Sequence, residues 1–191
     1  MLPEQISLLR IKYLTTVVIM SGCLSHEETI YDAHASDFVQ LVNLAADIRA
    51  RQQQLIPNYS GSGGGSGSGG FQLDMAVIHP LYLTATKCRC PVTRRRAIQA
   101  LYTGPDFEGA WEGVVSARLG ERVMQIEEEG IASLDLDRLR DGELVGIPER
   151  ARIHSVDICT EPAQGRATVY FGRRPNGPGT DWDDLQEEMT W

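Results

Sequence analysis

Basic residues and long apolar segments are both scarce in this 191-residue chain. Its 18 Lys and Arg residues face 26 Asp and Glu residues, so the formal net charge is -8 at neutral pH. Proteins that grip nucleic acids usually carry a basic face, and this balance argues against direct nucleic-acid binding. The longest mainly apolar run, Tyr13–Met20, is far shorter than the roughly 20 residues of a membrane span. The sequence therefore predicts no membrane partner.

Cysteine is equally scarce, with four residues in the chain: Cys23, Cys88, Cys90 and Cys159. Their scattered spacing does not suggest a disulfide framework and fits a reducing compartment. Cys88 and Cys90 form a CxC pair, but a structural zinc site needs four ligands and no partner pair exists. We therefore expect no metal and no cofactor in this chain.

Catalytic motifs are missing as well. None of the four histidines lies in an HExxH pattern or beside a plausible nucleophile; they are His26, His34, His79 and His154. There is no GxSxG elbow, P-loop or EF-hand loop, and no pair of carboxylates stands out as a catalytic dyad. These absences predict no catalytic residue and favour a binding or regulatory protein over an enzyme.

The segment GSGGGSGSGG, Gly61–Gly70, has a composition that no core or turn requires. Such sequences behave as flexible coils and are a usual engineered spacer. It matches the GxGxxG nucleotide pattern by accident, because no strand precedes it. We interpret it as an engineered linker that replaces a native loop, and we expect the natural protein to be longer.

Two helices are predicted before this linker. The first begins at Pro3 and ends near Gly22, and it is apolar nearly all round, which predicts a central position. Its stripe at helical spacing consists of Ile6, Leu9, Tyr13, Val17 and Met20. The second covers Asp37–Leu55, and its apolar stripe is Phe38, Leu41, Ala45 and Ile48.

Three further helices are predicted after the linker. Leu73–Lys87 contains Pro80, which should kink or split it. Val92–Tyr102 points Ala97, Ile98 and Leu101 inward, with Arg94, Arg95 and Arg96 as a solvated outer face or a weak nuclear-import or partner contact. Phe107–Glu129, capped by Asp106, has a stripe of Trp111, Val115, Leu119, Val123 and Ile126 and a solvated end at Glu127, Glu128 and Glu129.

The last third of the chain changes character. Arg152–Thr160 and Arg166–Phe171 alternate between apolar and polar residues, which predicts a hairpin. The acidic tail carries spaced apolar residues, and two interpretations stay open. It is either a segment that offers them to a coactivator or a third strand at Glu187–Trp191 that docks on the helices. Its candidate partner contacts are Trp182, Leu185, Met189 and Trp191.

Together these segments predict a mainly α fold, an antiparallel helical bundle or solenoid-like core with a small C-terminal antiparallel β-hairpin or three-stranded sheet. We expect one folded unit in four parts. Residues 1–60 form N-terminal helices, residues 61–70 the linker, residues 71–130 a central helical core, and residues 131–191 the hairpin and the acidic-aromatic tail.

One ligand pocket can be suggested from the sequence. His79 lies beside Pro80 in an apolar helix, where the proline frees backbone polar groups. The surrounding aromatic and apolar residues fit a core, and they also allow a pocket lined by His79, Tyr82, Trp111 and Arg118.

Most of the chain outside the linker resembles the regulatory region of fungal zinc-cluster transcription factors, which carry a six-cysteine binuclear zinc DNA-binding domain at the N-terminus. The residues that carry the resemblance are Leu9–Leu14, Ser25–Asp32, Met75–Arg89, Arg94–Ile98, Glu108–Glu112, Ala117–Val123 and Ile147–Val156. The six-cysteine cluster itself is absent from this chain, and Cys90 stands where relatives tend to place an acidic residue.

The resemblance implies a regulatory and protein-interaction domain that controls transcription in the nucleus, with a small molecule as a candidate effector. Its implied partners are transcriptional co-regulators and a second copy in a homodimer, and zinc is expected only in the absent DNA-binding domain. The alternative is an enzyme, or an oligomerisation module, built on the same helical scaffold.

Overall fold

The structure is a computed structural model that describes residues 3–54, 77–104, 107–129, 131, 135–161, 166–177 and 179–190. In these residues it contains five α-helices and two small antiparallel sheets. The predicted mainly α fold with a solenoid-like core is therefore wrong, and the protein is of mixed α and β class. The expected linker, residues 61–70, lies outside the described residues.

All five helices precede the larger sheet along the chain, and two short strands lie between the fourth and the fifth helix. The helices are α1 (Pro3–Cys23), α2 (Ala35–Gln54), α3 (Ile78–Lys87), α4 (Pro91–Tyr102) and α5 (Gly113–Glu128), with short 3-10 helices η1 (Glu28–His34) and η2 (Glu149–Ala151). The strands are β1 (Phe107–Glu108), β2 (Trp111–Glu112), β3 (Ser155–Glu161), β4 (Arg166–Arg173) and β5 (Asp183–Thr190).

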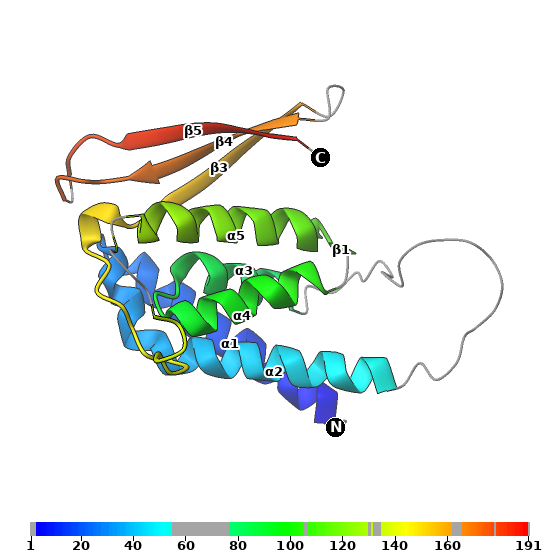
Figure 1. Ribbon diagram of the computed structural model, residues 1–191. Helices are drawn as coiled ribbons and strands as arrows, with labels where there is room; N and C mark the ends of the chain where they lie inside the picture. The colour runs from blue at the N-terminus through cyan, green and yellow to red at the C-terminus, as the bar shows by residue number, and fades with distance from the viewer. Residues whose placement is uncertain are drawn as a thin grey trace.

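The helices and the larger sheet are stacked in layers (Figure 1). The sheet lies across α5, α3 and α4 lie beneath α5, and α1 and α2 form the far side. The main apolar core contains residues of α1, α2, α3 and α4, together with Ala117 and Met124 of α5. A second apolar cluster joins the opposite face of α5 to the sheet through Val123, Val169 and Phe171. Helix α5 is therefore buried on two sides.

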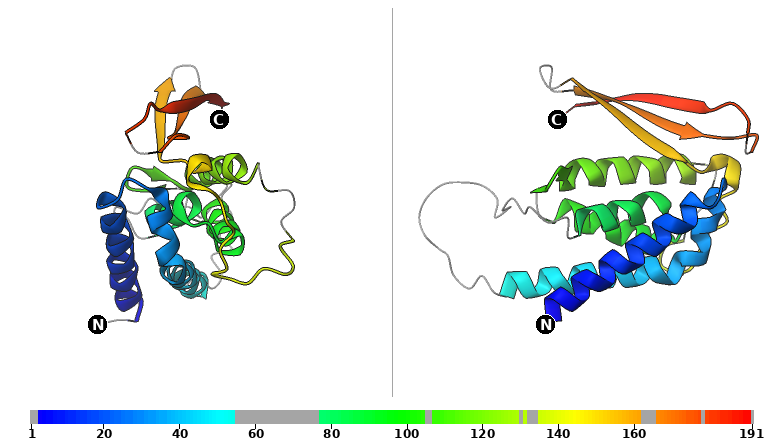
Figure 2. Two further views of the ribbon diagram at one scale, coloured as in Figure 1. Left: turned by 90° about the vertical axis from the view of Figure 1, so that its left-hand side faces the viewer. Right: turned by 180° about the vertical axis from the view of Figure 1, so that it is seen from behind.

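Helix α1 lies at the side of the molecule and not at its centre (Figure 2). Ile11, Leu14 and Val18 are its buried residues in the main core. The apolar stripe that predicted a central position is instead largely exposed, because α1 is apolar on two faces and only one of them meets the protein. The segment Glu4–Cys23 is long and apolar enough to cross a membrane. The core helix of a soluble protein and a signal sequence meet the same criteria of length and composition.

Helix α3 begins at Ile78, so Pro80 falls in its first turn and causes no kink in the described residues. A proline is tolerated there because the first amides of a helix have no partner within it. The backbone amides of Val77 and Ile78 donate to Glu108 Oε2, each at 2.8 Å. The buried Glu108 carboxylate thus satisfies the start of α3.

The long helix predicted over Phe107–Glu129 is shorter than expected. Strands β1 and β2 pair antiparallel, with Glu108 opposite Trp111. Gly109 between them has a φ of 59°, a left-handed conformation that glycine adopts without strain. This turn delays the helix to Gly113, and Asp106, the predicted cap, lies outside the described residues.

The larger sheet has the order β3-β4-β5, with both pairs antiparallel. Strand β4 buries alternate residues, Ala167, Val169 and Phe171, against α5. Strand β5 starts at Asp183, four residues before the predicted start. The acidic tail is therefore a sheet strand from Asp183 to Thr190, and Trp182 lies just before it.

Candidate functional site

A cavity of about 610 Å³ lies between the sheet and the N-terminal half of α5. The helical side contributes Trp111, Val115 and Leu119, and the sheet contributes Ile158, Thr160 and Val169, among others. The walls are mainly apolar, with a few polar groups. A mainly apolar cavity of this size with few polar groups is typical of small-molecule sites.

Three of the four predicted pocket residues line this cavity: Tyr82, Trp111 and Arg118. The fourth, His79, contacts Trp111 with ring centroids 4.9 Å apart and ring planes tilted by 44°. It lines a smaller cavity that also reaches Tyr82. The Tyr82 and Trp111 rings are 5.3 Å apart and tilted. The structure therefore gathers an aromatic group from α3 and β2 at one end of the cavity.

Burial sets the charge state of these groups. It raises the pKa of Tyr82 to about 12, with a smaller contribution from Asp157, so the phenol stays protonated and can donate a hydrogen bond. Burial also lowers the pKa of His79, which keeps its imidazole neutral at pH 7. The cavity wall therefore combines the uncharged Tyr82 and Trp111 with two charged residues, Arg118 and Glu112.

The predicted partner contacts of the tail separate into different surroundings. Met189 lines the cavity and packs on the apolar cluster below the sheet. Leu185 is partly exposed on the same face of β5. Trp182 lies before β5, with the Arg174 guanidinium 4.1 Å from its ring centroid. Trp191 lies outside the described residues.

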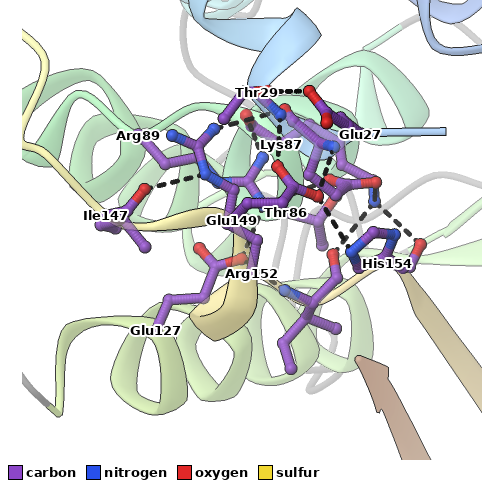
Figure 3. A network of polar contacts seen from close by, with 12 residues as sticks. Glu27, Thr29, Thr86, Lys87, Arg89, Glu127, Ile147, Glu149, Arg152 and His154 are labelled. Atoms are coloured by element: carbon purple, nitrogen blue, oxygen red, sulfur yellow. Dashed lines mark hydrogen bonds and ion pairs between the residues drawn. The ribbon is translucent and has the colours of Figure 1, made fainter. Parts of the chain in front are cut away.

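A buried network of charges lies at the other end of α5 (Figure 3). Glu127 accepts hydrogen bonds from Arg89 at 2.6 Å and Arg94 at 2.5 Å. All three side chains are fully buried. Although burial alone would raise the pKa of Glu127, Arg94 and Arg89 lower it to about 2.

This network corrects two predictions. Arg94, expected on a solvated face, is buried, and Arg95 and Arg96 pair with Glu128 and Asp141. Glu127, expected at a solvated helix end, is the centre of the buried cluster. Charged residues reach the interior here because each has a partner of opposite charge.

The same network fastens the sheet to the helices. Lys87 Nζ donates to Glu28 Oε1 at 2.8 Å and to the backbone oxygens of Ile153 at 3.2 Å and His154 at 2.9 Å. Glu127 also accepts from the Ile153 amide at 2.8 Å. Residues 153 and 154 directly precede β3. We call residues 153 and 154, where the chain enters β3, the root of the sheet. The root is held by polar contacts, whereas the strands beyond it cover the cavity.

A neighbouring set of contacts ties η1 to the connection before β3. Arg152 reaches Asp32 with two nitrogens, at 2.8 and 2.7 Å. Glu149 accepts from the amides of Glu28 and Thr29, at 2.8 and 2.9 Å. These bonds join segments about 120 positions apart in the chain.

The CxC pair serves the fold. Cys90 caps α4, and its sulfur accepts from the amides of Thr93 and Gly142. Burial raises the pKa of the Cys88 thiol to about 12, so it remains protonated. Among the residues that the structure describes, no group of three or more His, Cys, Asp or Glu side chains is arranged to hold a metal ion.

Comparison with known proteins gives no relative. No family model matches the chain, and neither a curated protein nor a solved structure matches it significantly.

Proposed function

We propose that the chain is a regulatory and protein-interaction domain of a transcription factor of the fungal zinc-cluster class, and that it binds a small molecule between the sheet and α5. One observation carries the proposal: the cavity of about 610 Å³, with Tyr82, Trp111 and Arg118 in its wall. Cavities of this size bury most of a drug-sized ligand. The resemblance of the helical segments to that family supports the transcriptional role.

The chemistry of the wall favours a largely apolar ligand with an aromatic portion. Trp111 in the wall offers an aromatic ring against which a ligand ring can pack. The protonated Tyr82 and the guanidinium of Arg118 can donate hydrogen bonds to one acceptor group on the ligand, and Glu112 in the same wall can accept one.

A ligand in this position contacts both layers at once. It would touch α5 on one side and β3, β4 and Met189 of β5 on the other. Binding would therefore favour one placement of the sheet, and the tail strand would carry the change to co-regulators in the nucleus.

The binding step can be tested with the fluorescent apolar anion 1-anilinonaphthalene-8-sulfonate as a probe. Thr160 lines the cavity, whereas its neighbour Cys159 lies on the opposite face of the same strand. We expect Thr160→Phe to occupy part of the cavity and weaken probe binding about tenfold, and Cys159→Phe, the matched control, to leave it unchanged. Equal binding by both variants would count against the cavity.

The regulatory step needs a separate test. Residues 1–191 fused to an unrelated DNA-binding domain should change a reporter in fungal cells, and Thr160→Phe should shift that output while Cys159→Phe does not. A reporter that stays silent with wild type and both variants, in cells where the fusion is folded and nuclear, would contradict the transcriptional role.

A further inference from the structure

The outer face of α1 is an apolar surface that nothing in the described residues covers. Ile6, Leu9, Tyr13 and Met20 expose 53%, 62%, 66% and 53% of their surface. The half-buried Val17 completes the stripe. On a helix of 3.6 residues per turn these five positions fall within one narrow sector, opposite the buried Ile11 and Val18. An exposed apolar stripe of this length is typical of an interaction surface.

The spacing of the stripe is symmetric about its middle residue. From Ile6 to Met20 the intervals are 3, 4, 4 and 3 positions, with Tyr13 at the centre. Two such helices placed antiparallel would set Ile6 against the second Met20, Leu9 against the second Val17, and the two Tyr13 rings against each other. A two-fold interface uses the same surface of both copies, so that surface must be complementary to itself. A surface that binds a different protein has no such requirement.

The charges of the helix allow the same arrangement. After Glu4, α1 contains no acidic residue, although the whole chain has a net charge of -8. Arg10, beside the stripe, is turned towards α2, where its Nη2 donates to Gln40 Oε1 at 2.7 Å. Two copies that meet through α1 therefore keep their acidic surfaces apart.

From this geometry we infer that the outer face of α1 pairs with the same face of a second copy, as an antiparallel helix pair with a two-fold axis at Tyr13. A helix of 21 residues is about 32 Å long, so the contact is small for a specific interface and the dimer is weak, with a dissociation constant roughly in the micromolar range.

Sedimentation equilibrium of the full chain over a range of concentrations tests the pairing. Leu9→Glu and Tyr13→Glu should each weaken the dimer roughly tenfold or more, because they place a charge in the apolar contact. Both residues are exposed, so the fold should survive, and circular dichroism checks this. Gln99→Glu, which adds the same charge at an exposed position of α4, is the matched control.

The geometry is tested by cross-linking in a Cys23→Ser, Cys159→Ser background, which removes the exposed thiols. Helices packed about 8–10 Å apart bring Cα atoms on a two-fold axis within disulfide range. Under air oxidation Tyr13→Cys should therefore give a covalent dimer, and Gln99→Cys should not. Equal cross-linking of the two would overturn the arrangement.

Salt distinguishes a second copy from an acidic partner, because screening relieves repulsion between two copies and weakens attraction to acidic groups. The dimer should tighten as salt is added. A chain that stays monomeric at every concentration overturns the inference. So does binding to phosphatidylglycerol vesicles that depends on Leu9 and Tyr13 while the chain stays monomeric, since that result assigns the face to a membrane surface.

Discussion

At the scale of single residues, the Glu127 carboxylate binds the side chains of Arg89 and Arg94 and the backbone amide of Ile153, just before β3. Burial would raise its pKa, but Arg94, Arg89 and the Ile153 amide lower it to about 2, from an ordinary value of 4.5. Folding therefore favours the ionised form. The resulting stabilisation, about 3 kcal/mol, is fully present above pH 4.5 and is lost as the pH falls through 4.5 towards 2.

We predict that Glu127→Gln lowers the free energy of unfolding at pH 7 by about 3–5 kcal/mol, because it leaves Arg89 and Arg94 buried without their carboxylate. The difference from wild type should shrink as the pH falls from 4.5 to 2. Urea unfolding at several pH values measures both effects. Glu129→Gln, at the exposed end of the same helix, is the control. A difference that did not vary with pH would contradict the ionised network.

At the scale of elements, the contact between α3 and α5 depends on a glycine. A Cβ atom at Gly120 would lie 2.5 Å from the Cβ of Ala85, so the two helices must separate to accept it. We predict that Gly120→Ala destabilises the protein by about 1–3 kcal/mol, although alanine favours helix by about 1 kcal/mol. Thermal unfolding measures the change.

The control for this prediction is Gly146→Ala, where an added Cβ meets nothing within 4 Å. Its effect should stay within about 0.5 kcal/mol. Ala85→Gly should partly restore the stability of Gly120→Ala, since it removes the opposing methyl group. If Gly120→Ala were as stable as wild type, the close approach of the two helices would be wrong.

Helices with one apolar face were predictable from the sequence. The predicted stripe of α2, from Phe38 to Ile48, is buried throughout, because helical spacing fixes the face once polar residues occupy the other. Helix α1 has apolar residues on two faces, so periodicity could not decide which one meets the core. Strands β1 and β2 were missed because two-residue strands leave no period to detect.

The two parts of the candidate site differ in how far the sequence could predict them. Of the four predicted pocket residues, Tyr82, Trp111 and Arg118 line one cavity, whereas His79 lines a smaller one beside it. The other wall of the larger cavity depends on how the sheet docks, which local patterns do not encode. The buried network was missed because Arg94 and Glu127 are 33 positions apart, and a charge run is usually a solvated face.

At the scale of the whole molecule, the helices and the sheet meet in two ways. The apolar cluster of Val123, Val169 and Phe171 joins the inner face of the sheet to α5. At the root of the sheet, Lys87 of α3 joins the backbone of residues 153 and 154 to the helices. Burial lowers the pKa of Lys87, whereas Glu28 opposes that shift and favours the ammonium form. Removing this ammonium should release the root of the sheet before it affects α1 and α2, which Lys87 reaches through Glu28 of the intervening η1.

We therefore predict that Lys87→Met speeds backbone hydrogen exchange in residues 153–161 and 166–172 about tenfold or more, because the carbonyl oxygens of Ile153 and His154 lose their shared donor. Exchange in α2 should change far less, and mass spectrometry of peptides separates the two regions. Arg138→Met is the control, since that side chain is 86% exposed. Equal acceleration in α2 and in β3 would mean that the layers unfold together and that the root is not a separate attachment.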